Sequence, residues 1–271
     1  MKATNEPDLP ESDLPESVIR RRTLKAFGWF ALASVVPVGV YTWIQNSPNL
    51  AGIRKPLRKV LDVNEDIAST YFSSNHLVRT YPVEAAARVP RVNGFDGLRT
   101  PLPDDWKLQI DRQGSNGEPQ EPLLLTMDDV KALPRQELVY DFKCVEGWSQ
   151  IQHWSGVRFS DFMERYQLGT RSGKAPSPDT TDDLYKFVGM ETPDKGYYVG
   201  IDMESAMHPQ TLLAYELNGE PINNQHGAPV RLLIPHKYGV KNLKRIGRIF
   251  FSDTRPRDFW AERGYDYYLG L

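Results

Sequence analysis

The strongest feature of the hydropathy pattern is an apolar run near the N-terminus. Residues 26–53 contain no charge, and residues 26–44 are almost wholly apolar. At about 1.5 Å per residue, a helix over this stretch crosses most of a hydrocarbon core about 30 Å thick. Because the run is apolar on all faces, with Trp29, Tyr41 and Trp43 toward its ends, it favours a membrane span over a buried soluble helix.

The regions on either side of this run differ from it in composition. Residues 1–19 are acidic and contain three prolines, so we predict a disordered tail that cannot bury enough apolar surface to become ordered. Beyond the run, apolar residues recur at roughly helical spacing: Ile53, Leu57, Val60, Leu61 and Ile67. We therefore expect residues 51–74 to form an amphipathic linker helix and residues 75–271 to form the globular domain.

The rest of the chain alternates short strand-like runs with turn signals, as in residues 106–110, 138–142 and 230–234. Long periodic helical runs are scarce. Residues 169–183 are polar and rich in turn formers, which indicates an exposed loop. The pattern predicts an α+β domain with mixed β-sheets and short helices.

Two segments of the domain are expected to be short helices. The first covers residues 126–132, with Thr126 as the N-cap before Asp128 and Asp129. The second covers residues 158–166, in which Ser160 can act as a cap.

Composition and charge narrow the functional classes. The chain has 271 residues, of which 40% are hydrophobic and 25% charged, as expected for a protein with a sizeable core. A formal net charge of -2 gives no support for nucleic-acid binding. A single cysteine, Cys144, excludes an intramolecular disulfide, a CxxC redox pair, a cysteine-rich zinc site and a CxxCH haem attachment.

Basic residues lie on both sides of the apolar run, so their distribution does not decide its orientation. The sequence RRRTLK at residues 20–25 resembles the twin-arginine export motif, with Thr23 where an aromatic residue is usual. The alternative is the plain basic flank of a membrane helix. The A-x-A pattern within the apolar run, at residues 31–33, falls too early for a cleavage site. We expect residues 20–50 to be an uncleaved single-pass anchor in the inner (cytoplasmic) membrane, with the domain facing the periplasm.

Cys144 lies at the end of a strand-like run, in the sequence FKCVEGWS. A lone cysteine is more often an inert buried hydrophobe. Its context indicates a different role. The first block combines LTMDDV at residues 125–130, LP at 133–134, KCVEGWS at 143–149 and WSGV at 154–157. The second combines HPQTLLAY at residues 208–215, NG at 218–219, HGAPVR at 226–231 and KYGVKNLK at 237–244.

Together these blocks resemble the molybdopterin-binding domain of the sulfite oxidase superfamily, and within it most closely the bacterial periplasmic sulfoxide reductase catalytic subunits. The resemblance implies the sulfite-oxidase-type fold and a molybdenum-molybdopterin cofactor, bound in a cleft between the end of the Cys144 strand and residues 226–244. Soft thiolate sulfur suits a metal already held by the dithiolene of the pterin. Cys144 is thereby implied as the metal ligand. Because Glu146 is adjacent to Cys144, we hypothesise a catalytic role for it in positioning substrate or moving protons; the alternative is that it only packs or caps the strand end.

The resemblance also implies a set of cofactor contacts: Asn75, Val78, Arg79, Thr192, His226, Arg231, Asn242, Leu243 and Lys244. The phosphate of the cofactor is anionic and needs cationic partners, which Arg231, Lys241 and Lys244 are expected to supply. Taken singly, His226 can equally be a turn residue, Arg231 a strand-edge charge and residues 237–244 a solvated basic face.

The implied reaction is reduction of an S-oxide or N-oxide by oxygen-atom transfer. Since the chain has neither a haem motif nor iron–sulfur cysteines, we expect a membrane haem or quinol-linked subunit to supply the electrons. The first alternative is a sulfite-type dehydrogenase that passes electrons to a cytochrome. The second is a non-enzymatic, membrane-anchored binding or assembly module that retains the fold.

Overall fold

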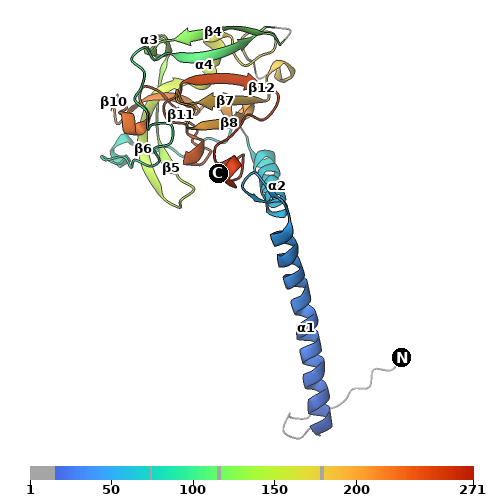
Figure 1. Cartoon of the computed structure of the whole chain (residues 1–271). Coiled ribbons are helices and arrows are strands. Elements are labelled where there is room, and N and C mark those ends of the chain that lie inside the picture. Colours follow the sequence, from blue (N-terminus) through green and yellow to red (C-terminus); the bar gives the residue numbers. More distant parts are fainter. Residues whose placement is uncertain (1–15, 74, 115–116, 178–179) are drawn as a thin grey trace. The chain divides into compact units, whose positions relative to one another are not determined.

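The computed structural model describes residues 16–73, 75–114, 117–177 and 180–271, and the described residues divide into two compact units between Leu57 and Arg58. Residues 1–15 of the predicted disordered tail lie outside the described residues, and residues 16–19 are helical, so the prediction of disorder is wrong for these four residues. The first described element is helix α1 (Glu16–Asn46), which contains Pro37 (Figure 1). By length and composition, Thr23–Asn46 is a candidate membrane span.

The side chains of α1 support this assignment, since Phe27, Trp29 and Val36 are all exposed. A helix that exposes apolar side chains along its length suits a lipid environment better than water. After α1, a two-stranded hairpin forms from β1 (Asn49–Leu50) and β2 (Ile53–Arg54). Both residues of its turn, Ala51 and Gly52, have positive φ angles, as a type I′ hairpin turn requires.

The larger unit contains two five-stranded sheets. The first has the order β10-β9-β6-β5, with β11 also paired to β9, and all its pairs are antiparallel. Its strands are β5 (Arg135–Lys143), β6 (Ser149–Arg158), β9 (Leu212–Leu217), β10 (Glu220–Pro221) and β11 (Arg231–Leu233). The β5–β6 hairpin is paired from Arg135 and Val157 to Lys143 and Ser149, so the turn between the two strands holds residues 144–148.

The second sheet has the order β4-β3-β12-β7-β8 (Figure 1). Its strands are β3 (Leu108–Gln113), β4 (Pro119–Leu125), β7 (Phe187–Glu191), β8 (Tyr198–Asp202) and β12 (Arg248–Ser252). The β12–β3 pair is parallel and the others are antiparallel, which makes this sheet mixed, as predicted.

The helices of this unit are short, apart from α2 at the boundary between the units. They are α2 (Lys55–Tyr71), α3 (Met127–Lys131), α4 (Phe159–Tyr166) and α5 (Met203–Met207). Thr126 caps α3 as predicted, in a capping box with Asp129. The expected Ser160 cap is wrong. The N-cap of α4 is Arg158, which makes no side-chain capping bond because a guanidinium has no acceptor atom. The helix begins at Phe159, so Ser160 lies inside its first turn and is not the cap.

Two apolar clusters organise the domain. The first joins both sheets, since Val157 and Leu213 of one sheet pack with Val188 and Ile249 of the other. The second lies on the opposite face of the first sheet and includes the residues Leu138, Tyr140, Phe142, Trp154, Leu217 and Leu233, with Trp148 packed against them. Strand side chains alternate between faces, so β5 contributes Tyr140 and Phe142 to the same side. The candidate site lies beside this second cluster.

Candidate active site

A cavity of about 160 Å³ opens beside the turn that joins β5 to β6. Three segments provide most of its walls: the 144–148 turn, residues 91–96 (the 91–96 loop), and residues 226–244. Six of the predicted site residues line it: Cys144, Glu146, His226, Arg231, Asn242 and Lys244.

The Cys144 side chain is held at the cavity wall by a tight turn. The Cys144 N–H donates to the carbonyl of Trp148 at 3.0 Å, and the Cys144 carbonyl accepts from the Gly147 N–H at 3.0 Å. Gly147 has a φ of 85°, a conformation that favours glycine. The CVEGW sequence therefore reverses the chain directly after β5 and leaves the thiol, 5% exposed, at the edge of the cavity.

The Glu146 carboxylate is fixed by two neutral donors. Its Oε2 accepts from the side-chain amide of Asn93 at 3.2 Å and from the Trp148 indole at 3.1 Å. The same Asn93 nitrogen lies 3.7 Å from the Cys144 sulfur, within the range of an N–H to sulfur hydrogen bond. Asn93 thus connects the predicted metal ligand to the predicted catalytic carboxylate.

Arg231 places a buried positive charge beside the cavity. Only 3% of the residue is exposed, and its guanidinium lies 4.7 Å from the centre of the Trp154 ring. It donates to the carbonyls of His226 and Asn242, each at 3.1 Å, while its Nε has no hydrogen-bond partner among the described residues. Burial lowers the pKa of Arg231 to about 10. A desolvated guanidinium of this kind is well suited to an anionic ligand.

Lys244 provides a second cation at the same cavity. Its Nζ donates to the carbonyls of Asn93 (2.7 Å), Gly94 (3.0 Å) and Gln225 (2.8 Å), so it joins the 91–96 loop to the segment before His226. Burial, followed by repulsion from Arg231, lowers the pKa of Lys244 to about 7. Within the described parts of the chain, neither cation forms an ion pair with a carboxylate. Arg231 and Lys244 therefore bring positive charge to the cavity that no direct ion pair neutralises among the described residues, although the carboxylates of Asp96 and Glu146 also line it.

His226 ends a short 3₁₀ turn, η4 (Asn224–His226), whose N-cap Asn223 accepts the His226 N–H. Gly227 follows with a φ of 99°, and a Cβ at that position would lie 2.7 Å from the Cβ of Lys244. Glycine thus allows this turn to pack directly on the Lys244 backbone. Burial, then the nearby Arg231 and Lys244, lowers the pKa of His226 to about 4, so the ring is neutral at pH 7.

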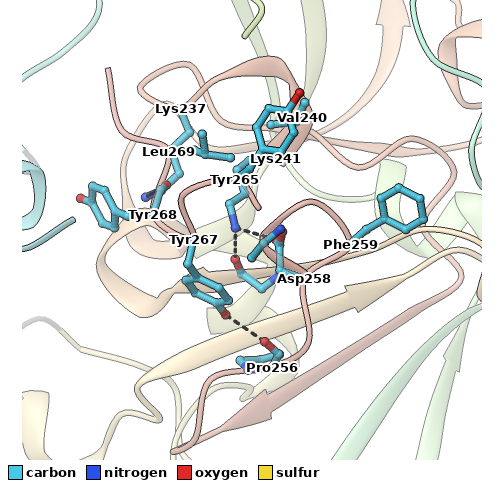
Figure 2. Close-up of polar contacts among 12 residues, drawn as sticks. Lys237, Val240, Lys241, Pro256, Asp258, Phe259, Tyr265, Tyr267, Tyr268 and Leu269 are labelled. Carbon is cyan, nitrogen blue, oxygen red and sulfur yellow. Dashed lines mark hydrogen bonds and ion pairs between the residues drawn. The ribbon is translucent and has the colours of Figure 1, made fainter. Parts of the chain in front are cut away.

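The predicted phosphate-binding role of Lys241 is wrong. Figure 2 shows the Lys241 ammonium paired with Asp258, at 2.5 Å, and it also donates to the carbonyl of Gly200 at 2.9 Å. Only 1% of the Lys241 side chain is exposed, and it lies 4.3 Å from the centre of the Tyr267 ring. Because the 3₁₀ turn η5 (Gly239–Lys241) aims this side chain into the interior, its charge is neutralised there and does not reach the cavity.

The other predicted cofactor contacts lie outside the cavity lining. Leu243 is fully buried in the first apolar cluster, and the Val78 backbone is engaged in both directions by the Gln210 side chain. Asn75 and Arg79 are exposed, with Arg79 over the Tyr81 ring. Their roles stay predictions.

Thr192 supports the cavity from behind. Its hydroxyl donates to Asp194, which also accepts from Thr100, and the residue packs against Gly97 so closely that a Cβ on Gly97 would overlap it. It thereby anchors the end of the 91–96 loop, whose Asp96 lines the cavity.

Several residues that line the cavity are not among the sequence-based predictions. They are Arg91, Asn93, Asp96, Gln152, Trp154, Tyr197, Trp260 and Tyr265. In the 91–96 loop the sequence offers only a Pro-x-x-Asn-Gly turn signal, which indicates a loop and not a binding site. Trp154 belongs to the WSGV motif, but its contact with Arg231 depends on tertiary packing.

Residues 96–260, more than half of the chain, match the oxidoreductase molybdopterin binding domain. The chain belongs to this family. The α+β fold, the molybdopterin cofactor and the oxidoreductase class predicted from the sequence are therefore confirmed. The matched region contains Cys144, Glu146 and all the candidate residues of the 226–244 segment, whereas Asn75, Val78 and Arg79 precede it.

Relatives in this family carry sulfoxide reductase names. The chain is 30% identical to the protein-methionine-sulfoxide reductase catalytic subunit MsrP of Burkholderia mallei, over 97% of this chain and 80% of that protein. It is 35% identical to the subunit of the same name from Campylobacter jejuni, over 62% of this chain and 57% of that protein. It is 31% identical to the putative protein-methionine-sulfoxide reductase subunit YedZ1 of Azospira oryzae, over 76% of this chain and 73% of that protein.

Among solved structures, the sulfane dehydrogenase SoxCD from Paracoccus pantotrophus matches with a TM-score of 0.45 and 20% identity. The alignment covers 58% of this chain and 40% of that one.

The residues at the cavity fit the cofactor of the family. Among the described residues, no group of three or more His, Cys, Asp or Glu side chains is placed to hold a metal, so those residues do not by themselves complete a metal site around Cys144. The dithiolene of a molybdopterin supplies further ligands. The anionic part of that cofactor would meet Arg231 and Lys244, which have no carboxylate partner among the described residues.

Proposed function

We propose that this protein is a membrane-anchored, molybdopterin-dependent oxidoreductase that reduces an S-oxide or N-oxide. The observation that carries the proposal is the position of the lone cysteine in the same cavity as Arg231 and Lys244. A thiol for the metal and two cations for the anionic end of its organic carrier are the complementary halves of such a site. Methionine sulfoxide is the substrate class named for the relatives, and we extend it to this chain as part of the proposal.

In this proposal each residue has a distinct task. Cys144 provides the thiolate ligand of the metal. Arg231 and Lys244 bind the anionic group, and His226 and Asn242 complete the wall around the pterin. When bound, the molybdenum centre would supply the oxygen-atom transfer chemistry. Leu243, Thr192, Asn75, Val78 and Arg79 remain proposed contacts, which would act through their backbone atoms or by supporting the loops.

Glu146 is proposed to manage protons. Reduction of an S-oxide to a sulfide consumes two electrons and two protons and releases one water molecule. Glu146 is adjacent to Cys144 and lines the cavity, and the donors Asn93 and Trp148 hold its Oε2 in one position. A fixed carboxylate at the cavity wall can transfer a proton to an oxygen that leaves the substrate.

The two electrons must enter from another protein. The single cysteine is committed to the metal in this scheme, and the sequence has no haem-attachment motif. We propose a membrane haem or quinol-linked subunit as the donor. Residues 20–50 would anchor the domain beside it as one uncleaved pass through the inner membrane, with residues 75–271 in the periplasm and residues 51–74 as the link.

Two alternatives make different predictions. A sulfite-type dehydrogenase would use the same residues to oxidise a small anion and pass electrons to a cytochrome. An anchored binding or assembly module would keep the fold without turnover. The first is distinguished by its substrates and the second by its metal content.

The test uses full-length protein produced in a molybdenum-competent host and measures molybdenum, pterin and two activities. We expect stoichiometric cofactor and oxidation of reduced viologen by methionine sulfoxide. Cys144→Ser should abolish turnover, while Ser149→Ala, at the exposed start of β6, should not change it. Sulfite oxidation with a cytochrome acceptor in place of sulfoxide reduction would favour the dehydrogenase. Protein that lacks molybdenum would contradict the proposal.

A further inference from the structure

Helix α2 packs on the domain through polar side chains. Arg58 and Glu65 are each only 8% exposed. The Arg58 guanidinium donates to the carbonyls of Tyr265 (2.7 Å) and Ala261 (2.8 Å), and the Glu65 carboxylate pairs with Arg255. A surface helix of a soluble protein normally turns its apolar stripe toward the core, so this arrangement is the reverse of the usual one.

The opposite face of α2 carries an apolar stripe. Val60, Val63, Ile67 and Tyr71 are 58%, 56%, 53% and 78% exposed. They follow one another at intervals of three, four and four residues, so they lie in a single row along the helix. We call these four residues the α2 stripe. A contiguous exposed apolar row of this kind marks a surface that is covered by a membrane or another molecule.

We propose that the α2 stripe lies in the headgroup region of the lipid bilayer, with α2 parallel to the membrane surface. The inference rests on the anchor in the proposed function. The candidate span ends at Asn46 and α2 begins at Lys55, so eight residues separate them, and six of these, residues 49–54, form the β1–β2 hairpin. Eight residues reach at most about 28 Å when fully extended, and a hairpin shortens that reach. The stripe is thus held within a short distance of the bilayer.

The polar residues beside the stripe fit a lipid surface. Lys55, Lys59, Asp62 and Asp66 are exposed, and by helical geometry they lie on the flank between the stripe and the buried face. The lysines can extend along an apolar surface and keep their ammonium groups in water. Two positive and two negative charges balance, so apolar burial and not attraction to anionic lipid would hold the helix, and its insertion should be insensitive to salt.

An embedded α2 would fix the catalytic cavity with respect to the membrane. Arg58 donates to the carbonyl of Tyr265, and Tyr265 lines the cavity. The helix that carries the α2 stripe is therefore bonded, through Arg58, to a residue in the wall of the cavity. Such a connection would present the cavity at a constant height to an electron donor in the membrane.

The experiment places a fluorescent label at single introduced cysteines of the full-length protein in phosphatidylcholine vesicles, with and without brominated acyl chains. The stripe positions are V63C and I67C, and the matched controls on the polar flank are D62C and D66C. A label at V35C in α1 reports whether the anchor is inserted in the bilayer. The parent protein, whose only cysteine is the buried Cys144, gives the background level of labelling.

We expect brominated lipid to quench the labels at 63, 67 and 35 several-fold more strongly than those at 62 and 66, equally at low and high salt. If the label at 35 is quenched but those at 63 and 67 match the flank, the bilayer is not the occupant, and a protein partner takes its place. If the label at 35 is also unquenched, the anchor of the proposed function fails and the inference fails with it.

Discussion

The side-chain amide of Asn93 lies 3.7 Å from the Cys144 sulfur and 3.2 Å from Oε2 of Glu146. The Asn93 amide thus contacts both Cys144, the proposed metal ligand, and Glu146, the proposed proton donor. Its backbone carbonyl is in turn held by Lys244 at 2.7 Å. Asn93 is therefore fixed from both ends, and it positions Cys144 and Glu146 relative to each other.

Asn93→Ala should lower turnover while leaving molybdenum content unchanged. A hydrogen bond to a charged group contributes about 1.5–3 kcal/mol, so we expect turnover to fall by about tenfold or more. Asn93→Asp should be worse, because a second carboxylate would repel Glu146. Asn64→Ala, on an exposed face of α2, is the control. Parental turnover in Asn93→Ala would show that this amide does not position the site.

Glu146→Gln tests the proposed proton transfer. The amide keeps the size of the side chain and an acceptor oxygen for Asn93 and Trp148, but it cannot donate a carboxylic proton. We expect a loss of about 10²-fold or more in kcat and a flatter pH profile, with KM less affected. The measurement is steady-state kinetics across a pH series. Full turnover at every pH would exclude the role.

We predict that the binding of an anion beside Lys244 depends on pH near neutrality. Its pKa is lowered to about 7 by burial and Arg231, and a bound anion would raise it. Binding should therefore take up a proton, and affinity should fall by up to about tenfold per pH unit above pH 7. Calorimetric titration of cofactor-free protein with pyrophosphate, in buffers of different ionisation enthalpy, measures both effects.

The matched variants for this titration are Lys244→Met, which should remove the proton uptake, and Lys143→Met at the exposed end of β5, which should preserve it. Equal affinity at pH 6.5 and pH 8.5 in the parent would contradict the assignment of Lys244 to the anion.

A buried histidine pair predicts loss of stability in acid. The His208 and His236 rings lie 4.4 Å apart, and both ring nitrogens of His236 lack partners among the described residues. Burial and the neighbouring His208 and Lys237 lower the pKa of His236 to about 3. Because an unfolded histidine takes up a proton below pH 6.5, this residue's contribution should fall by up to about 1.4 kcal/mol per pH unit from there toward pH 3.

Urea unfolding at pH 7 and pH 4.5 measures this effect. His236→Phe keeps a ring against Phe72 and should reduce the difference in unfolding free energy between the two pH values. His76→Gln, at an exposed position, should leave the difference as in the parent. An unchanged pH dependence in His236→Phe would assign the acid sensitivity to other groups.

The sequence predicts much of the site because local patterns position its main residues. The CVEGW turn presents Cys144 at the end of β5, and the HGAPVR and KNLK motifs bring His226, Arg231 and Lys244 to the same cavity. The difference between Lys241 and Lys244 is not local. Both look like phosphate ligands in the sequence, but Asp258 binds Lys241 inside the domain.

Long-range contacts explain the other differences. Asn93 reaches Cys144 across 51 residues, so nothing near Cys144 in the sequence identifies it. Hydrophobic spacing predicts the α2 helix correctly, and Lys55–Tyr71 lies within the expected linker. The spacing does not predict which face is buried, because the partners of Arg58 and Glu65 lie about 200 residues away, near the C-terminus.

The three carbonyls that receive the Lys244 ammonium belong to two different walls of the cavity, one before β3 and one before β11. The Lys244 ammonium thus connects the 91–96 loop to the segment that precedes β11. Arg91 is exposed and lines the cavity, so a bound cofactor should shield it, and we expect tryptic cleavage after Arg91 to be slower in loaded protein than in empty protein. The rate of this cleavage, followed on a gel, would then report how much of the protein contains the cofactor without any assay of turnover.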